Sequence, residues 1–285
     1  MRLFKSTAVI ALFVVGSMAL AAAQGNKKSA DPALLTISNT GSVLHTPSLT
    51  AIFWGAEWTD ASFAGDIISG FDSLLSGYSN SDYAHTPIEY SDRSGRITPF
   101  ASYWGHTIDT SAAPVAGGLT SSVAVAEACR ITNNQPDPGG IYVVVTSTGS
   151  GPNGCAFHTW GTCGTGRKAL PIQVAAVPYA SGAIGTGCEG VQDFETGHSL
   201  ALAQMANLTM HEVVETITDP RGSGWRDAFG DEIADKCIKI FPPSVGLYSL
   251  FSNGSIWKLQ AEWSNAAYLA GTGAPNATGQ RACIW

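Results

Sequence analysis

Residues 205–220, "MANLTMHEVVETITDP", have the pattern of a single helix that carries three ionisable side chains, His211, Glu212 and Glu215. The helix should end at Asp219-Pro220, since proline cannot continue helical hydrogen bonding. Residues i and i+4 stack on one helical face, so His211 and Glu215 can both reach a single cation while Glu212 points beside them. This spacing predicts a metal-binding helix, and the alternative is a helix with a solvated acidic face.

The segment that follows, "GSGWRDAFGDEIADKC" (222–237), supplies further carboxylates in Glu232 and Asp235. Zinc sites are often completed by a ligand from a second segment, with another carboxylate orienting a metal-bound histidine. We therefore expect three side chains to bind one divalent ion: His211, Glu215 and Glu232. Asp235 is expected behind these ligands; its alternative role is a helix-end charge beside Lys236.

The expected ion follows from the ligand types. One histidine and two carboxylates leave a divalent ion with no net charge, so water bound to it should be less acidic than at a site with two histidines and one carboxylate. Zinc is the first expectation, and oxygen-rich ligation also suits manganese or calcium.

Two residues are expected to act on a substrate. Glu212 occupies the general-base position of helical zinc-hydrolase motifs, which predicts metal-assisted hydrolysis of a peptide bond. His158, in "CAFHTW" (155–160), is a candidate further ligand or oxyanion donor; the alternative is a structural histidine in a loop pinned by disulfides. Arg226 and Tyr248 are candidates to stabilise the oxyanion.

The N-terminal sequence predicts secretion. Arg2 and Lys5 precede an apolar run at 8–15 and small residues at 21–23, so residues 1–23 are expected to be a signal peptide. We expect a flexible mature N-terminus at 24–36 and one domain at 37–285. No later run is long and apolar enough for membrane insertion. The expected location is extracellular.

Charge and cysteine content narrow the partners. The chain after cleavage has 13 basic and 22 acidic residues and no long basic run, which argues against nucleic acid as a partner. Six cysteines without a Cys-x-x-Cys pair favour up to three disulfides over a thiolate metal cluster, with the pairing left open. The expected partner is a peptide or protein substrate, or a cell-wall component.

The remaining pattern predicts an α+β fold of mixed α/β character. Strands are expected within 49–55, 96–105, 140–147 and 170–179, with helices over 62–76 and 120–131. Asn253-Gly254 lies between two β-prone arms in 248–263 and predicts a C-terminal hairpin. We expect a central mixed sheet packed by helices, including the helix that carries His211.

Several segments together resemble the phosphate-induced protein 1 or EXORDIUM family of secreted proteins. The resemblance rests on "HEVVETITDP" (211–220), "GW" (224–225) and "EIADKC" (232–237), and extends to "LTAIFWG", "CAFHTW" and "NGSIWKLQAEWSN". It implies an extracellular protein of the kind linked in plants to cell expansion and growth signalling, with a motif similar to that of zincin metalloproteases. Thr218-Asp219 before the proline, and a shorter segment around Cys188, depart from the plant pattern.

Two function classes therefore stand side by side. The first is a secreted metal-dependent peptidase with a zincin-like fold. The second is a non-catalytic extracellular binding or signalling protein of the EXORDIUM kind, in which the metal is structural. Of three Asn-x-Ser/Thr sequons, Asn207 lies one turn before His211, so we expect it to carry no glycan.

Overall fold

The structure is a computed structural model that describes residues 31–115, 117–148, 155–180, 193, 195–242 and 249–285. The expected signal peptide lies outside the described residues. The packed unit begins at Asp31, before the expected boundary at residue 37. Leu35, placed in the flexible segment by the sequence analysis, is 1% exposed. Both its amide and its carbonyl bond the Asn265 side chain, which explains why this segment is ordered.

Five strands form the central sheet, in the order β3 (Ser102–Asp109), β2 (Ser48–Trp54), β4 (Gly140–Thr146), β6 (Leu170–Val177) and β5 (Phe157–Cys163). The first four strands run parallel, and β5 pairs antiparallel with β6 at the edge. The apolar run "GIYVVVT" of β4 fits a central strand that is buried on both faces. The predicted mixed sheet is confirmed.

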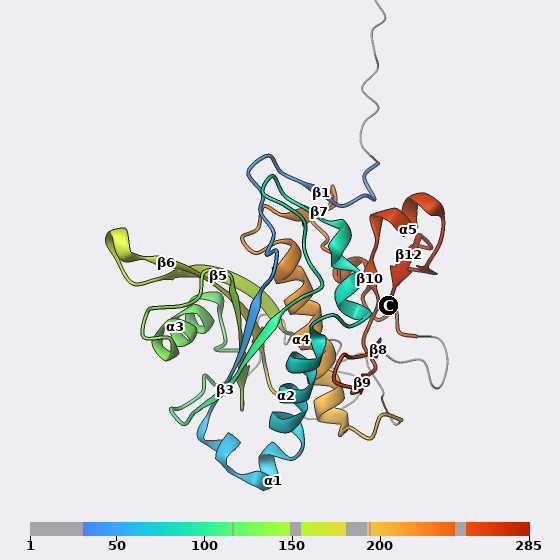
Figure 1. Ribbon diagram of the computed structural model, residues 1–285. Coiled ribbons are helices and arrows are strands. Elements are labelled where there is room, and N and C mark those ends of the chain that lie inside the picture. Colours follow the sequence, from blue (N-terminus) through green and yellow to red (C-terminus); the bar gives the residue numbers. More distant parts are fainter. Residues whose placement is uncertain (1–30, 116, 149–154, 181–192, 194, 243–248) are drawn as a thin grey trace, which may run out of the picture. The chain divides into compact units, whose positions relative to one another are not determined.

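Helices cover both faces of this sheet (Figure 1). Helix α3 (Ser121–Ile131) packs on one face, and α4 (Leu200–Thr218) packs on the other beside α2 (Ile67–Tyr78). A hydrophobic core lies on each face of the sheet, and successive residues of β4 point into opposite cores. Val143 faces the side of α2 and α4, and Val144 faces the side of α3. The sheet thus fixes the position of α4 from one side.

Three sequence-based expectations are corrected. The strand expected at 96–105 begins only at Ser102, because Pro99 lacks the N–H that a strand ladder needs. The helix expected at 62–76 is divided into α1 (Ala61–Ala64) and α2 by Gly65, whose φ of +52° ends the first segment. The segment around His158, expected to be a loop in one interpretation, is strand β5.

The C-terminal part packs beyond α4. Strands β10 (Glu262–Trp263), β12 (Arg281–Ile284) and β11 (Ala274–Pro275) form a small sheet beside α5 (Asn265–Ala270). The expected hairpin is present in short form, as β8 (Ser249–Leu250) and β9 (Ile256–Trp257) around Asn253-Gly254. Near the N-terminal boundary, β1 (Thr36–Ile37) pairs with β7 (Trp225–Arg226).

Short 3-10 helices connect these elements. They are η1 (Ala56–Thr59), η2 (Tyr83–His85), η3 (Pro87–Glu89), η5 (Gly166–Lys168) and η6 (Asp235–Cys237). Of these described 3-10 helices, only η6 carries a residue of the candidate site, which is Asp235.

Helix α4 is fixed at both ends. The Ser199 hydroxyl accepts the Leu202 amide and donates to Asp66, which caps the first turn. The last turn ends at Asp219, whose carboxylate accepts the amide of Gly224. Within the helix, Asn207 is 3% exposed and its side-chain oxygen accepts the Gln260 amide, so the folded chain offers no room for a glycan there.

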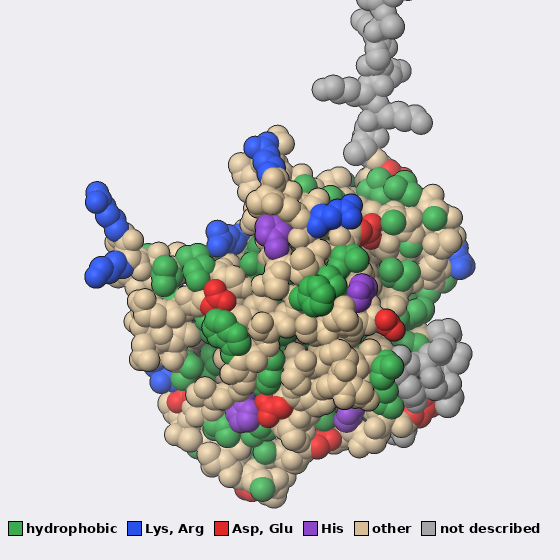
Figure 2. Space-filling view, in the orientation of Figure 1, with side chains coloured by type: hydrophobic (Ala, Val, Ile, Leu, Met, Phe, Trp, Pro, Cys, Tyr) green, Lys and Arg blue, Asp and Glu red, His purple; other side chains and the backbone are tan. Residues whose placement is uncertain are grey.

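Between described residues, two disulfides join distant segments: Cys129–Cys163 and Cys237–Cys283. They are compatible with the expected extracellular compartment. A bridge to Cys188 would lie outside the described residues. None of the described helices has the length and apolar character to span a membrane. On the face drawn in Figure 2, Lys and Arg side chains are scattered and form no continuous patch.

Glu262 is a buried carboxylate outside the candidate site. Glu262 is 0% exposed, and neither of its oxygens has a hydrogen-bond partner among the described residues. Burial raises its pKa well above the usual range, and the nearby Tyr83 hydroxyl offsets this only in part. The folded state therefore favours the protonated acid.

This burial predicts a pH dependence that Glu262→Gln should remove. Above about pH 4.5 the unfolded chain releases this proton while the folded chain keeps it, so the free energy of unfolding should fall as pH rises, by up to about 1.4 kcal/mol per pH unit. Urea unfolding of both proteins from pH 5 to pH 8 measures this. The variant should gain stability relative to wild type as pH rises; two parallel curves would contradict the assignment.

Candidate metal centre

Helix α4 carries His211, Glu212 and Glu215 into the interior of the protein. Glu212 and Glu215 are 5% and 3% exposed, so the alternative of a solvated acidic face is wrong. Glu215 lies one turn after His211, and its Oε1 is 3.1 Å from His211 Nε2. The predicted i, i+4 pair is therefore formed, inside the protein.

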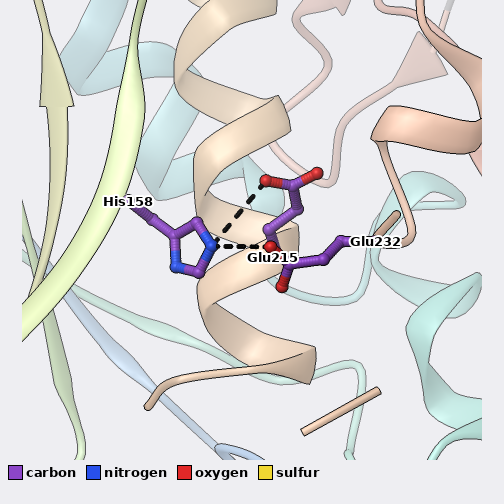
Figure 3. A group of neighbouring side chains, drawn as sticks. All are labelled: His158, Glu215 and Glu232. Carbon is purple, nitrogen blue, oxygen red and sulfur yellow. Dashed lines mark hydrogen bonds and ion pairs between the residues drawn. The ribbon is translucent and has the colours of Figure 1, made fainter. Parts of the chain in front are cut away.

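Strand β5 brings His158 to the same helix. Its Nε2 lies 3.0 Å from Glu232 Oε2 and 3.9 Å from Glu215 Oε2 (Figure 3). His158 projects from the antiparallel edge strand toward α4, and Glu232 approaches from the segment after β7. Three segments that are distant in sequence thus contribute to one cluster.

The segment that carries Glu232 and Asp235 is held by a buried ion pair and a disulfide. Lys236 Nζ lies 2.7 Å from Asp227 and 4.1 Å from the centre of the Trp263 ring. Asp227 Oδ1 also accepts the amides of Phe229 and Asp231, which closes the turn. The neighbouring Cys237 is tied to β12 by its disulfide. These contacts orient the 227–237 segment toward α4.

Arg226 fixes Glu232 from the other side. Its guanidinium Nε donates to Asp219 at 2.5 Å and its Nη2 donates to Glu232 Oε2 at 3.1 Å. Asp219 is fully buried and also accepts the Gly224 amide. A side chain at position 224 would collide with the Thr218 carbonyl, so glycine permits this close approach. Arg226 therefore positions the Glu232 carboxylate, whereas the sequence had suggested that it stabilises an oxyanion. Tyr248, the other candidate for the oxyanion, lies outside the described residues.

The five candidate residues form two groups with metal-ligand spacing that share Glu215. One group is His158, Glu215 and Glu232; the other is His211, Glu215 and Asp235. In each group, the ligand atoms lie within 4.8 Å of one another. Glu232 was expected beside His211, whereas it pairs with His158 in the structure. Asp235, expected behind the ligands, lies 3.5 Å from His211 Nε2.

Glu212 opens into a cavity next to the second group. The cavity has a volume of about 230 Å³ and is lined by Cys155, Ala156, Leu208, His211, Glu212, Asp235, Ile238 and Gln260. Its wall thus combines apolar side chains with the two acids and the histidine of the candidate site. A small part of a substrate can enter beside Glu212.

Burial and mutual charge shift the pKa values of the cluster. Burial raises the pKa of Glu212 to about 8 and that of Glu232 to about 7. For His158, burial opposes the charged ring, but Glu232 and Glu215 outweigh it and raise its pKa to about 9. The pKa of His211 rises for the same reason, with Glu215 as the main cause. Positive charge is therefore strongly favoured between these carboxylates.

The residues present fit a divalent cation. Glu232 is almost fully buried, and its Oε1 has no hydrogen-bond partner in the described part of the chain. A buried carboxylate oxygen without a partner is costly unless a ligand or ion meets it. Each group offers one imidazole and two carboxylates, a donor set that zinc and manganese accept.

Comparison with protein-family models, with curated proteins and with solved structures gives no match. The resemblance to the EXORDIUM family therefore stays a prediction, and the function must be argued from the site.

The dual role of Arg226 predicts a large effect of Arg226→Ala on stability. Removal of the guanidinium leaves the buried Asp219 without its cationic partner and Glu232 with only His158, which should lower the free energy of unfolding by about 2–4 kcal/mol in metal-free protein. The exposed Arg221→Ala serves as the control and should stay within about 0.5 kcal/mol of wild type. Urea unfolding in the presence of a chelator measures the stability of both variants. Equal stability of Arg226→Ala and Arg221→Ala would show that Arg226 does not stabilise the buried carboxylates.

Proposed function

We propose that this chain is a secreted, metal-dependent hydrolase that cleaves peptide bonds, with Glu212 as the general base. The observation that carries the proposal is the position of Glu212, which is buried and lines the cavity together with His211 and Asp235. A divalent ion would be held by His211, Glu215 and Asp235, or by His158, Glu215 and Glu232. Zinc is the preferred ion, with manganese and calcium as alternatives.

A bound ion would supply Lewis acidity toward a substrate carbonyl and toward water. Glu212 would accept a proton from water in the cavity and donate it to the leaving amine. In the metal-free protein Glu212 is mostly protonated at neutral pH, because its pKa is about 8. Nearby cationic charge favours the carboxylate, so Glu212 would be ionised when the site is loaded.

The edge strand β5 supports a peptide as the substrate. In the part of the sheet that the structure describes, β5 pairs only with β6, so its other edge offers backbone groups to an extended chain. His158 projects from this strand into the cluster, which would bring a peptide paired with β5 close to Glu232 and Glu215.

One feature favours the second function class, a non-catalytic extracellular protein of the EXORDIUM kind. The cluster joins β5, α4 and the segment after β7, so an ion there would also cross-link three parts of the fold. In that case Glu212 would have no proton to transfer. The two classes differ in what the loss of the Glu212 carboxylate does to catalysis.

Glu212→Gln tests the proposal. The amide keeps the shape of the side chain but cannot accept the proton, so cleavage of a casein-type protein substrate should fall by about 10²–10⁴-fold while bound metal stays unchanged. The exposed Glu195→Gln is the matched control and should keep wild-type activity. Metal content by mass spectrometry and peptide release are measured on the same samples. Bound metal without cleavage in wild type would favour the structural role.

A further inference from the structure

The two carboxylate oxygens of Glu215 face different histidines. Oε1 lies 3.1 Å from His211 Nε2, and Oε2 lies 3.9 Å from His158 Nε2. Each histidine has a second carboxylate of its own, Asp235 for His211 and Glu232 for His158. Glu215 is thus the shared member of two otherwise separate sets of ligands.

One ion cannot bind all of these side chains in the observed arrangement. Ligand atoms on one zinc lie about 2.0–2.2 Å from it, so any two of them are at most about 4.4 Å apart. In the described residues, no group within 4.8 Å contains both histidines, and none contains His211 together with Glu232. The observed spacing therefore matches two ions better than one.

We propose that the cluster is a two-ion centre in which Glu215 bridges the ions through its two oxygens. The first ion is held by His211, Glu215 and Asp235, and the second by His158, Glu215 and Glu232. Bridged pairs of divalent ions are an established way to build a hydrolytic centre. This inference rests on the proposed function for its chemistry, but the number of ions is measured independently.

Charge balance agrees with two ions. Four carboxylates surround the centre: Glu212, Glu215, Glu232 and Asp235. Arg226 and the fully buried Asp219 compensate each other at the edge of the cluster. Two divalent ions match the four formal negative charges, whereas one ion leaves two of them uncompensated, and of the four side chains only that of Asp235 is exposed to water. The unpartnered Oε1 of Glu232 provides a free ligand atom while Oε2 keeps its bond to Arg226.

The two half-sites differ in access. His211 and Asp235 line the cavity beside Glu212, and the Asp235 side chain is 41% exposed, whereas the side chains of His158 and Glu232 are only 8% and 7% exposed. The ion at His211 is thus the one placed to meet substrate, and the ion at His158 is enclosed. A chelator should remove the first ion faster than the second.

The test counts ions on the full chain. Protein stripped with a chelator is reloaded with zinc alone, freed of excess ion and analysed for bound metal. Wild type should hold two ions per chain, and release to a chelator should show a fast and a slow phase of equal size. His211→Ala should keep one ion and lose the fast phase. His158→Ala should keep one ion and lose the slow phase.

A matched control and a spectroscopic readout complete the test. His106 forms a similar pair with Asp72 outside the cluster, at 2.8 Å, so His106→Ala should still hold two ions. Manganese-loaded wild type should give the electron paramagnetic resonance spectrum of a coupled ion pair, and Glu215→Ala should lose that coupling.

The two-ion centre would be overturned if wild type bound only one ion and neither His211→Ala nor His158→Ala bound any, provided that both variants keep the wild-type fold. If wild type bound one ion and cleaved substrate, and Glu212→Gln abolished the cleavage, the proposed hydrolase would be supported and the two-ion centre rejected. Two ions without cleavage would support the centre and reject the hydrolase. Wild type that binds no ion would reject both.

Discussion

The arrangement of this protein depends on one constraint, which is that α4 carries its ionisable motif into the interior. Glu212 and Glu215 are almost fully buried between the central sheet and the C-terminal part of the chain, and Glu232 joins them there. Carboxylates in such a place need compensating positive charge or protonation. The positive charge comes from the two histidines, from Arg226 and, as proposed above, from metal ions. The strands, caps and disulfides around the cluster fix the positions of these groups.

That constraint links fold and function. The sheet places α4, and the antiparallel edge strand β5 brings His158 to it. The Lys236–Asp227 pair and the Cys237–Cys283 disulfide fix the segment that delivers Glu232 and Asp235. The contacts that stabilise the C-terminal part thus also position the ligands, so that stability and site geometry cannot be changed independently in this region.

The sequence predicted those parts of the site that depend on local spacing. His211 and Glu215 come together because residues four apart on a helix are neighbours, and this needs no knowledge of the rest of the chain. The four main parallel strands and α3 likewise follow from apolar runs and helical periodicity, apart from the late start of β3 after Pro99.

The sequence did not predict which carboxylate meets which histidine. That depends on the pairing of β5 with β6, and "CAFHTW" gives too weak a strand pattern to place His158 on a sheet edge. The turn at η6 is a second feature that the sequence pattern does not predict. There the Asp235 carboxylate accepts the Glu232 amide, and this turn directs the two acids toward different histidines. Spacing along the chain alone does not contain this information.

A crystal structure of zinc-loaded protein, with anomalous diffraction collected on both sides of the zinc absorption edge, tests most directly whether the buried cluster is a metal centre. Zinc density is expected on each side of the Glu215 carboxylate, one peak beside His211 and one beside His158. An anomalous map without density there, with His158 Nε2 still bonded directly to Glu232, would show that the cluster is not a metal centre.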